Sequence, residues 1–478
     1  MNDDILYVWI YPEGLLRPVL CGKLELLNGR KCVFSYDEGW IEREGAFALS
    51  PDMPLQSGVM DPPAKLDIHP IFEDAGPDRW GKNIINKVFN PQRRSPLEYL
   101  ELAGENRIGA LGFSRSASEY LAMDGASFHV ADLPELIRAA NALSLQMPID
   151  DNLRRLLRPG SSAGGARPKC IIKHRGEDWI AKFLADGDEH DVCAIEHASL
   201  ELARRCGINA VESELVKVSN RDVLLVKRFD RHHEGRVHFS SARTLLIADG
   251  IAEGQMGYAD VAAIARRLSS SPKEDSHELY RRMVLNILIE NTDDHEKNQA
   301  FVFHQGEWKL SPAYDVLPQL QGLGFHQMRI GKDGNKSRIA NALSECERFM
   351  LKPSEAKAVV EQMYEQVKSW RDVFANSGVP QRDIEACGSY VLRSAIFQFG
   401  KAPEKSQPAA GDRFYPGKIV AVDAQHVYQS QGRNVFVHHD RAKLKQLIFP
   451  EAVMEIQYVD GKVLVAEPQQ EASHGIGR

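Results

Sequence analysis

Apolar and polar residues alternate along the first part of the chain, with glycines at the breaks. This pattern predicts short β-strands that form a small, antiparallel, β-rich unit. We expect these strands at residues 7–11, 19–27 and 31–36. Helical spacing follows, and it predicts helices at residues 81–89, 95–102, 133–145 and 149–157.

The middle of the chain changes from strands to helices. Strands are expected at residues 170–173, 179–183, 211–218 and 222–226, with a helix at 191–206. From residue 258 onward the apolar spacing is helical, and it predicts a buried helix ending near Ile289, one amphipathic helix over 353–374 and a last helix over 384–399. After a segment of linker composition at 401–411 the period returns to two, which predicts a separate β-rich module.

Composition is that of a soluble globular protein. The 478 residues are long enough for several domains, and a net charge of −7 argues against a chain that coats nucleic acid over its whole surface. The seven cysteines follow no metal-ligand spacing and are expected to be reduced thiols. No signal peptide and no apolar run of membrane-spanning length is visible, so we expect a cytoplasmic protein without membrane contact.

Polar residues are concentrated where the buried helix ends, in Asn291-Thr-Asp-Asp-His-Glu-Lys-Asn298. Asp293 and Asn298 have the D-x-x-x-x-N spacing of a protein-kinase catalytic loop, in which Asp accepts the hydroxyl proton of the substrate and Asn holds Mg²⁺. Asp315, beyond a predicted hairpin, stands where a second metal-binding carboxylate is expected. The alternative interpretation is a capped helix end followed by a polar turn.

A loop rich in small residues, Pro159-Gly-Ser-Ser-Ala-Gly-Gly-Ala-Arg-Pro-Lys169, precedes a strand. Small residues let backbone N–H groups approach an anion, and Arg167 and Lys169 add positive charge. The loop lacks the P-loop and dinucleotide-binding patterns. Taken alone, it fits a flexible linker as well as it fits a phosphate-binding loop.

Strand alternation places Lys182 on the same side as Ile180 and Leu184, where a lysine needs an anionic partner. Glu196, at the margin of the apolar face of the next helix, is the candidate partner. The alternative is a surface lysine on an edge strand. The segment 227–231 is expected to be a hinge whose backbone binds an adenine edge with Phe229 packed nearby, although a salt-bridged strand end fits it equally well.

These motifs together resemble the HipA-like serine/threonine kinases, the toxins of bacterial toxin–antitoxin pairs. The resemblance covers residues 5–400 and includes five motifs in the order of that family. The motifs are Ser162-Ala-Gly-Gly-Ala-Arg-Pro-Lys169, Trp179-Ile-Ala-Lys-Phe183, Arg228-Phe-Asp-Arg231, Asn291–Asn298 and Pro312-Ala-Tyr-Asp315. The N-terminal unit, with Phe34-Ser-Tyr-Asp37, is similar to the first domain of the family.

The resemblance implies roles for individual residues. Asp293 would be the catalytic base, Asn298 and Asp315 would hold Mg²⁺, and Ser162, or its neighbour Ser161, would be autophosphorylated. ATP would be bound by Gly164, Gly165, Ala166, Arg167, Pro168, Lys169, Lys182, Lys227, Arg228, Phe229, His295, Lys297, Asn298 and Tyr314. A phosphate on the glycine-rich loop adds negative charge where ATP phosphates bind, which predicts self-inactivation.

The last residues resemble a KfrB domain of plasmid-associated proteins, on the basis of Gly417-Lys-Ile-Val-Ala-Val-Asp423, the strand at 426–429 and Tyr458-Val-Asp-Gly-Lys462. We therefore expect an α+β chain with a two-lobed protein-kinase-like fold. Its expected parts are an N-terminal β-rich subdomain at 1–115, a kinase-like domain at 116–400, a linker at 401–411 and a KfrB-like module at 412–478.

The function expected from this resemblance is that of an ATP- and Mg²⁺-dependent toxin kinase. The resemblance implies a substrate in translation, such as an aminoacyl-tRNA synthetase, and a helix-turn-helix antitoxin that binds operator DNA. Two alternatives assign the chain to other classes of protein. One is a kinase-fold co-repressor or plasmid-maintenance scaffold without activity, and the other is a metal-dependent hydrolase built on Asp293, Asp294 and His295, which leaves Lys182 unexplained.

Overall fold

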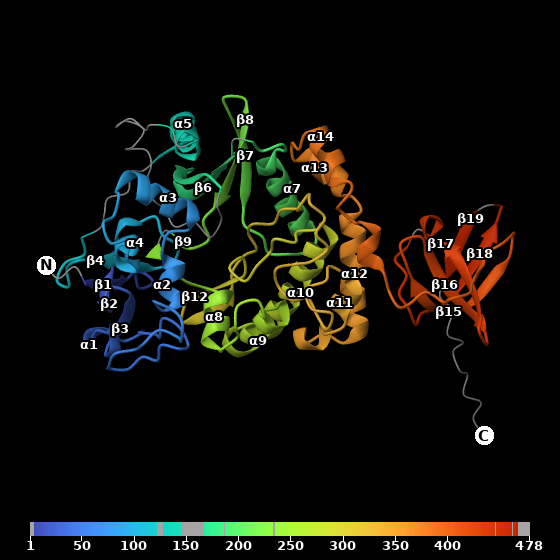
Figure 1. Ribbon diagram of the computed structural model, residues 1–478, viewed down its shortest axis with the longest axis horizontal. Helices are drawn as coiled ribbons and strands as arrows, with labels where there is room; N and C mark the ends of the chain where they lie inside the picture. The colour runs from blue at the N-terminus through green and yellow to red at the C-terminus, as the bar shows by residue number, and fades with distance from the viewer. Residues whose placement is uncertain are drawn as a thin grey trace, which may run out of the picture.

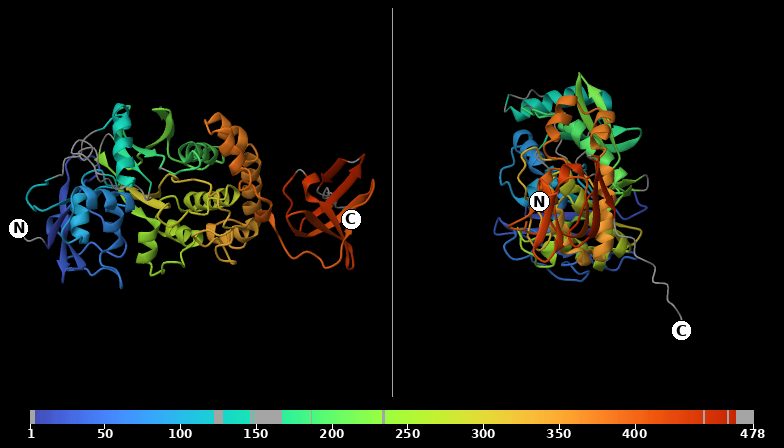
Figure 2. Two further views of the ribbon diagram at one scale, coloured as in Figure 1. Left: turned by 45° about the horizontal axis from the view of Figure 1, so that its top comes forward. Right: turned by 90° about the vertical axis from the view of Figure 1, so that its right-hand side faces the viewer.

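The computed structural model describes residues 4–121, 128–145, 147, 167–185, 187–232, 235–444, 446–460 and 462–466. Figures 1 and 2 show the N-terminal and C-terminal sheets at opposite ends of the molecule, with a mixed α/β body between them. No described helix combines the length and the apolar character needed to cross a membrane.

The N-terminal unit is an antiparallel four-stranded sheet in the order β3-β2-β1-β4, covered by helices. This confirms the predicted antiparallel arrangement. Its strands are β1 (Ile5–Ile10), β2 (Val19–Leu27), β3 (Lys31–Tyr36) and β4 (Leu111–Ser114). Its helices are α1 (Glu38–Ile41), α2 (Pro70–Ala75), α3 (Arg79–Val88) and α4 (Pro96–Leu102). The sheet shares one core with α1, α2 and α4, whereas Trp80 and Ile84 of α3 belong to the core of the second sheet, described below.

The upper lobe of the body is a second antiparallel sheet, in the order β5-β6-β8-β7. Its strands are β5 (Lys169–His174), β6 (Glu177–Phe183), β7 (Ser213–Val218) and β8 (Arg221–Lys227). The long helix α7 (Val192–Arg205) packs against β7 and β8, and the side chain of Asp191 caps it by accepting a hydrogen bond from the Ala194 amide at 2.9 Å. The η1 turn (Val130–Asp132) and α5 (Leu133–Ser144) lie beside β5.

The lower lobe is mainly helical and surrounds the small sheet β11-β12-β13. Its strands are β9 (Arg231–His232), β10 (Gly235–Arg236), β11 (His238–Ser241), β12 (Ala300–His304) and β13 (Glu307–Leu310). Its helices are α8 (Ala242–Ala248), α9 (Tyr258–Leu268), α10 (Pro272–Leu288), α11 (Ile339–Leu343), α12 (Pro353–Val367), α13 (Trp370–Asn376) and α14 (Gln381–Cys387), with η2 (Cys346–Phe349) and η3 (Ser394–Phe397). The predicted hairpin after the polar loop is confirmed as β12 and β13.

Two predicted helices are wrong in extent. The helix expected over 353–374 is two helices, because the chain turns between Val367 and Trp370, where the Ser369 hydroxyl donates to the Gln366 carbonyl at 2.9 Å. The helix expected over 384–399 is only α14 and the short η3. Leu392 has a φ of 55°, which no helix accepts, and its amide donates to the Leu288 carbonyl at 2.8 Å.

The C-terminal module is a six-stranded sheet in the order β14-β17-β16-β15-β18-β19. Its strands are β14 (Gln407–Pro408), β15 (Phe414–Val422), β16 (His426–Gly432), β17 (Val435–Asp440), β18 (Val453–Val459) and β19 (Lys462–Ala466), with η4 at Arg441–Lys443. Phe399 and Val422 exchange backbone hydrogen bonds of 2.8 and 2.9 Å, which joins this module to the body. The predicted domain limits stay a prediction.

Candidate active site

A buried lysine shared by two carboxylates lies between the lobes. Lys182 on β6 donates to Glu196 Oε1 at 2.6 Å and to Asp315 Oδ1 at 2.9 Å, so the pairing expected between Lys182 and Glu196 is present. Burial opposes the charge of Lys182, but Asp315 and Glu196 raise its pKa above the ordinary value. Lys182 is therefore held as a cation that faces the cleft.

The two carboxylates differ in their pKa. Burial raises the pKa of Glu196, and the nearby charge of Asp315 acts in the same direction. For Asp315, burial is outweighed by Lys182, so its pKa is lowered. Asp315 is thus kept ionised, as a metal-binding carboxylate must be.

Asp315 is positioned by a connection between the lobes. The Ala313 amide donates to the Asn209 carbonyl at 2.7 Å, and the Val211 amide donates to the Ala313 carbonyl at 3.0 Å. Asp315 itself has a φ of 59°, in the left-handed region that an L side chain seldom adopts. Such strain persists only where surrounding contacts hold it, and it is concentrated at functional sites.

Buried hydrogen bonds of the lower lobe hold the polar loop after α10 in place. Asn291 Nδ2 donates to Asn286 Oδ1 at 3.0 Å, and buried Asp294 accepts from the Tyr258 hydroxyl and from Gln299 Nε2, the latter at 3.0 Å. Asp294 is thus fully engaged inside the protein. Its neighbour Asp293 is exposed to the cleft.

Within the part of the chain that the structure describes, the side chain of Asn298 has a buried oxygen without a partner, which fits a metal ligand. Its side chain is only 3% exposed, and its Oδ1 atom has no hydrogen-bond partner among the described residues. A buried amide oxygen without a partner costs free energy unless something binds it. No group of three or more His, Cys, Asp or Glu side chains forms a metal cluster in the described residues, so a magnesium ion would rest on Asn298, Asp315, water and substrate oxygens.

The electrostatic environment of Asp293 suits a base. Desolvation raises its pKa above the ordinary carboxyl value, His295 acts in the opposite direction, and the charge of Asp315 raises it further. A general base with a raised pKa holds a transferred proton more strongly than an ordinary aspartate.

These side chains line one cleft of about 470 Å³. It contains Lys182, Glu196, Asp293, Asn298 and Asp315, together with Arg167 and Lys169 from the end of the glycine-rich loop. The structure therefore brings together the residues predicted for the base, for the metal and for part of the phosphate site. Ser162, Gly164, Gly165 and Ala166 lie outside the described residues.

The residues predicted to surround adenine lie beside this cleft. The rings of Phe229 and Tyr314 stack with centroids 5.6 Å apart at an interplanar angle of 23°. They line a cavity of about 30 Å³, together with Lys227, Arg228 and others. That volume holds one or two water molecules, so adenine can enter only if the walls separate.

The side chains of the hinge segment are largely used for structure. Arg228 donates to Asp230 Oδ2 at 2.7 Å and to the carbonyl of Arg107 at 2.7 Å, and Arg231 also pairs with Asp230. The salt-bridged interpretation of Arg228–Arg231 thus describes these side chains. Lys227 pairs with Glu177 at 2.6 Å.

Three predicted nucleotide residues lie apart from the cleft lining. Lys297 lines a different cavity, described below, and its carbonyl accepts from the Tyr314 hydroxyl at 2.7 Å. His295 lies in the loop near Asp293 and lowers its pKa. Pro168 contributes a carbonyl that accepts from the Phe183 amide at 3.0 Å.

The N-terminal unit supplies a residue that the sequence analysis missed. Asp78, which caps α3, accepts from the Lys169 ammonium at 2.7 Å, and both side chains are buried. Trp80 Nε1 donates to the Lys169 carbonyl at 3.2 Å. A cap preceding a helix was visible in Pro77-Asp78, but no local signal links it to Lys169.

Comparison with known proteins agrees with this architecture. The family model of the HipA N-terminal domain matches residues 15–114, that of the HipA-like C-terminal domain matches 161–371, and that of the KfrB domain matches 414–467. A solved chain from the toxin–antitoxin complex of HipA, HipB and operator DNA of Shewanella oneidensis MR-1 superimposes with a TM-score of 0.61 at 16% identity, over 80% of this chain and 94% of that chain.

Two relatives come from Sinorhizobium fredii. The candidate kinase Y4mE is 22% identical over 336 residues, which is 63% of this chain and 76% of that protein. The candidate kinase Y4dM is 23% identical over 377 residues, which is 73% of this chain and 87% of that protein. The fold is the two-lobed, protein-kinase-like fold of HipA. The chain belongs to the HipA family and carries a C-terminal KfrB domain.

Proposed function

We propose that this protein is an ATP- and magnesium-dependent serine/threonine protein kinase that acts as the toxin of a toxin–antitoxin system. The observation that carries the proposal is the single cleft in which Lys182, salt-bridged to Glu196 and Asp315, faces Asp293 and Asn298. Phosphoryl transfer depends on positioning and on charge stabilisation, and these side chains supply both.

In the proposed reaction the hydroxyl oxygen of a serine or threonine forms a bond to the γ-phosphorus of ATP. The bond from that phosphorus to the bridging oxygen breaks, and ADP leaves. Asp293 takes the hydroxyl proton, and its raised pKa favours that transfer. Lys182 holds the phosphates by its positive charge, which its two carboxylate partners maintain.

Asn298 and Asp315 would hold magnesium, since one offers an unpartnered buried oxygen and the other an ionised carboxylate. The ion supplies neutralisation of the charge on the transferred phosphoryl group. Phe229 and Tyr314 would clamp the adenine once their cavity widens.

Two features of the proposal rest on the family. Ser162 on the glycine-rich loop would be autophosphorylated and would switch the enzyme off. A HipB-like helix-turn-helix antitoxin would bind this chain and connect it to operator DNA, which is supported by the HipA structure solved with HipB and operator DNA. The target would be a translation component such as an aminoacyl-tRNA synthetase.

A second candidate function is a catalytically silent co-repressor or plasmid-maintenance scaffold. The KfrB domain at 414–467 favours it, because phosphoryl transfer does not require that domain. The narrow cavity beside Phe229 also fits a chain that does not bind nucleotide. Against it, the cleft contains Lys182, Asp293, Asn298 and Asp315, to which the proposal assigns phosphate binding, the base and the metal.

The test is labelling with γ-³²P-ATP and magnesium, followed by phosphopeptide mapping. We expect wild type to label itself on the glycine-rich loop, and we expect Asp293→Ala and Asp315→Ala to lose at least about a hundredfold of the rate. Asp275→Ala, which changes an aspartate outside the cleft, is the control for general damage. Growth arrest on expression should disappear with the same two substitutions.

The outcomes separate the candidates. Labelling that survives both Asp293→Ala and Asp315→Ala rejects the assigned roles. A wild type that binds ATP but transfers no label, and still represses an operator with its antitoxin, favours the scaffold. Label found only away from residues 159–169 removes the proposed self-inactivation and leaves the kinase.

A further inference from the structure

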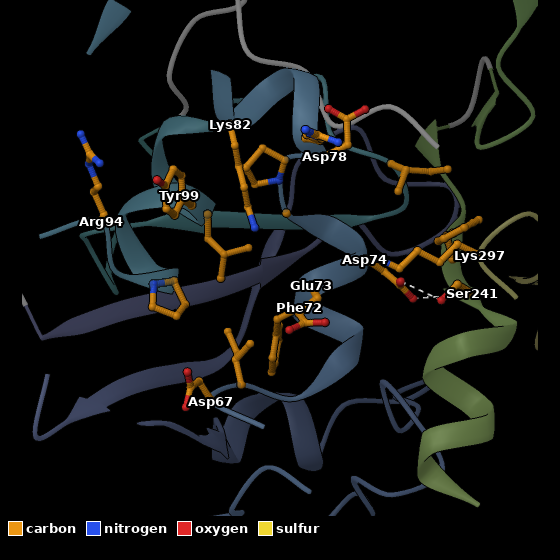
Figure 3. Close-up of a pocket in the computed structure, with 18 of the residues that line it drawn as sticks. Asp67, Phe72, Glu73, Asp74, Asp78, Lys82, Arg94, Tyr99, Ser241 and Lys297 are labelled. Atoms are coloured by element: carbon orange, nitrogen blue, oxygen red, sulfur yellow. Dashed lines mark hydrogen bonds between the residues drawn. The ribbon is translucent and has the colours of Figure 1, made fainter. Parts of the chain in front are cut away.

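A second cavity, of about 740 Å³, lies outside the proposed catalytic cleft, where the N-terminal unit meets the lower lobe (Figure 3). Its walls come from α2, α3 and α4 on one side and from β11 on the other. The catalytic loop reaches it through Lys297, four positions after Asp293. The cavity therefore adjoins the loop that carries the proposed base.

The carboxylates of this cavity are already engaged. The pairs are Asp67 with Arg30, Glu73 with Arg243 and Asp78 with Lys169, at 2.7 to 2.9 Å, and Asp74 with the hydroxyls of Ser241 and Thr244, both at 2.7 Å. Asp67, Glu73 and Asp78 are thus paired with cations, while Asp74 is held by two hydroxyls and by the nearby charge of Lys297.

The cations of the cavity form no ion pair with the described residues, although the charge of Lys297 opposes the rise that burial causes in the pKa of Asp74. Arg79, Lys82, Arg94 and Lys297 line it, all four are exposed, and none forms an ion pair with any residue in the described ranges. Lys82 lies over the ring of Tyr99, with its ammonium 5.5 Å from the ring centroid, and Figure 3 shows it pointing into the cavity. A concave surface with unpaired positive charge attracts an anionic ligand.

The rest of the lining distinguishes between anions. Pro96 and Tyr99, which are partly exposed, add apolar surface, which suits amino-acid side chains. The carboxylates of Asp67 and Glu73 would face a nucleic-acid backbone, which carries a negative charge on every residue. A segment with a few acidic side chains among apolar ones can place its charges on the cations and avoid those carboxylates.

We propose that this cavity binds an acidic segment of the protein acceptor and so delivers a neighbouring hydroxyl to Asp293. The inference rests on the proposed kinase function, for which it names a feature of the substrate. The cavity and the nucleotide cleft share a wall, because Lys169 lines the cleft while its partner Asp78 lines the cavity. An acceptor bound here therefore lies beside the cleft that would hold ATP.

The test measures binding of a fluorescent hexapeptide of alternating glutamate and leucine to the full chain in the absence of nucleotide. We expect wild type to bind it and the double variant Lys82→Glu, Arg94→Glu to bind about tenfold or more weakly. Lys87→Glu is the matched control, since it reverses an exposed charge on the same helix outside the cavity, and we expect it to bind like wild type. Circular dichroism verifies that each variant is folded.

Three results would overturn the proposal. One is no binding of the glutamate–leucine hexapeptide to wild type, and another is equal binding to the double variant. The third is hexauridylate RNA that binds more tightly than the peptide and loses affinity in the double variant, which would assign the cavity to nucleic acid. Because no ATP is present, a chain that binds the peptide but fails the labelling test refutes the kinase and not the cavity.

Discussion

In the cleft, the pKa of each charged side chain depends on the charges beside it. Lys182 donates to two carboxylates at 2.6 and 2.9 Å, and it lowers the pKa of Asp315 below the ordinary value. Glu196, the more buried of the two, has a raised pKa and serves to orient Lys182. Asn298 keeps a buried oxygen unpartnered in the same cleft. The site is thus organised to receive a cation at one point and phosphates at another.

The pH dependence of the proposed reaction follows from Asp293. Its pKa is raised above the ordinary 3.8, and the base works only when deprotonated, so activity is lost as pH falls through this raised pKa. His295 holds that pKa down, so removing it raises the pKa further. We expect His295→Ala to move the acidic limb of kcat, measured at saturating ATP, to higher pH. A limb that stays in place or moves lower contradicts the assignment of Asp293 as the base.

Elements far apart in the chain are joined by a buried ion pair. The carboxylate of Asp78 caps α3 by accepting from the Gly81 amide at 2.7 Å, and it also accepts from Lys169 at the start of β5 at 2.7 Å. Burial lowers the pKa of Lys169, and Asp78 opposes that change. Helix α3 therefore anchors the strand that follows the glycine-rich loop.

Removing Asp78 should destabilise the protein strongly. Asp78→Ala removes the carboxylate that accepts from the buried Lys169 ammonium and removes a helix cap, so we expect a loss of about 3–5 kcal/mol in the free energy of unfolding. Lys169→Met in the same chain removes the buried charge and should recover most of that loss. Urea unfolding of wild type, both single variants and the double variant measures the coupling. Additive effects, with no recovery, would show that the pair has no special energetic role.

At the scale of the whole molecule, the C-terminal sheet covers one end of the body. Phe399 pairs with Val422 through backbone hydrogen bonds, and its ring lies 5.5 Å from that of Phe449. The Arg441 guanidinium lies 5.1 Å from the ring centroid of Phe397. Figure 1 shows this sheet at the opposite end from the N-terminal unit. The proposed cleft lies between them and receives no side chain from the sheet.

Truncation after Gly411 should therefore leave the kinase activity nearly unchanged but cause the protein to self-associate. We expect self-labelling to stay within about twofold of wild type, because the removed residues are distant from the cleft. The cut exposes Phe397 and Phe399, so we also expect concentration-dependent self-association, measured by light scattering. Phe449→Ala in the full chain is a milder control. A truncated chain that remains folded but does not label would show that the KfrB domain takes part in the reaction.

Much of the site was predictable because its residues are close in sequence or belong to regular patterns. Asp293 and Asn298 share one loop, so their spacing alone places them together. Strand alternation turned Lys182 inward, and the helical spacing of 191–206 left Glu196 on its margin, where the two meet. The two wrong helices show the limit of periodicity. The apolar pattern continues past Val367 and Cys387, where α12 and α14 end, and a turn at Ser369 and a positive φ at Leu392 follow instead of helix.

By itself, the amino-acid sequence determined the β-rich ends, the helical lower lobe and the order of the motifs, since apolar periodicity and turn residues act over a few positions. Only the tertiary structure decided which charged groups, distant in the sequence, lie next to one another. Asp78 and Lys169, and the cations that face the second cavity, are brought together by the packing of the N-terminal unit on the body. Such pairings depend on the path of the whole chain, because a buried charge is stable only where the fold brings it a partner.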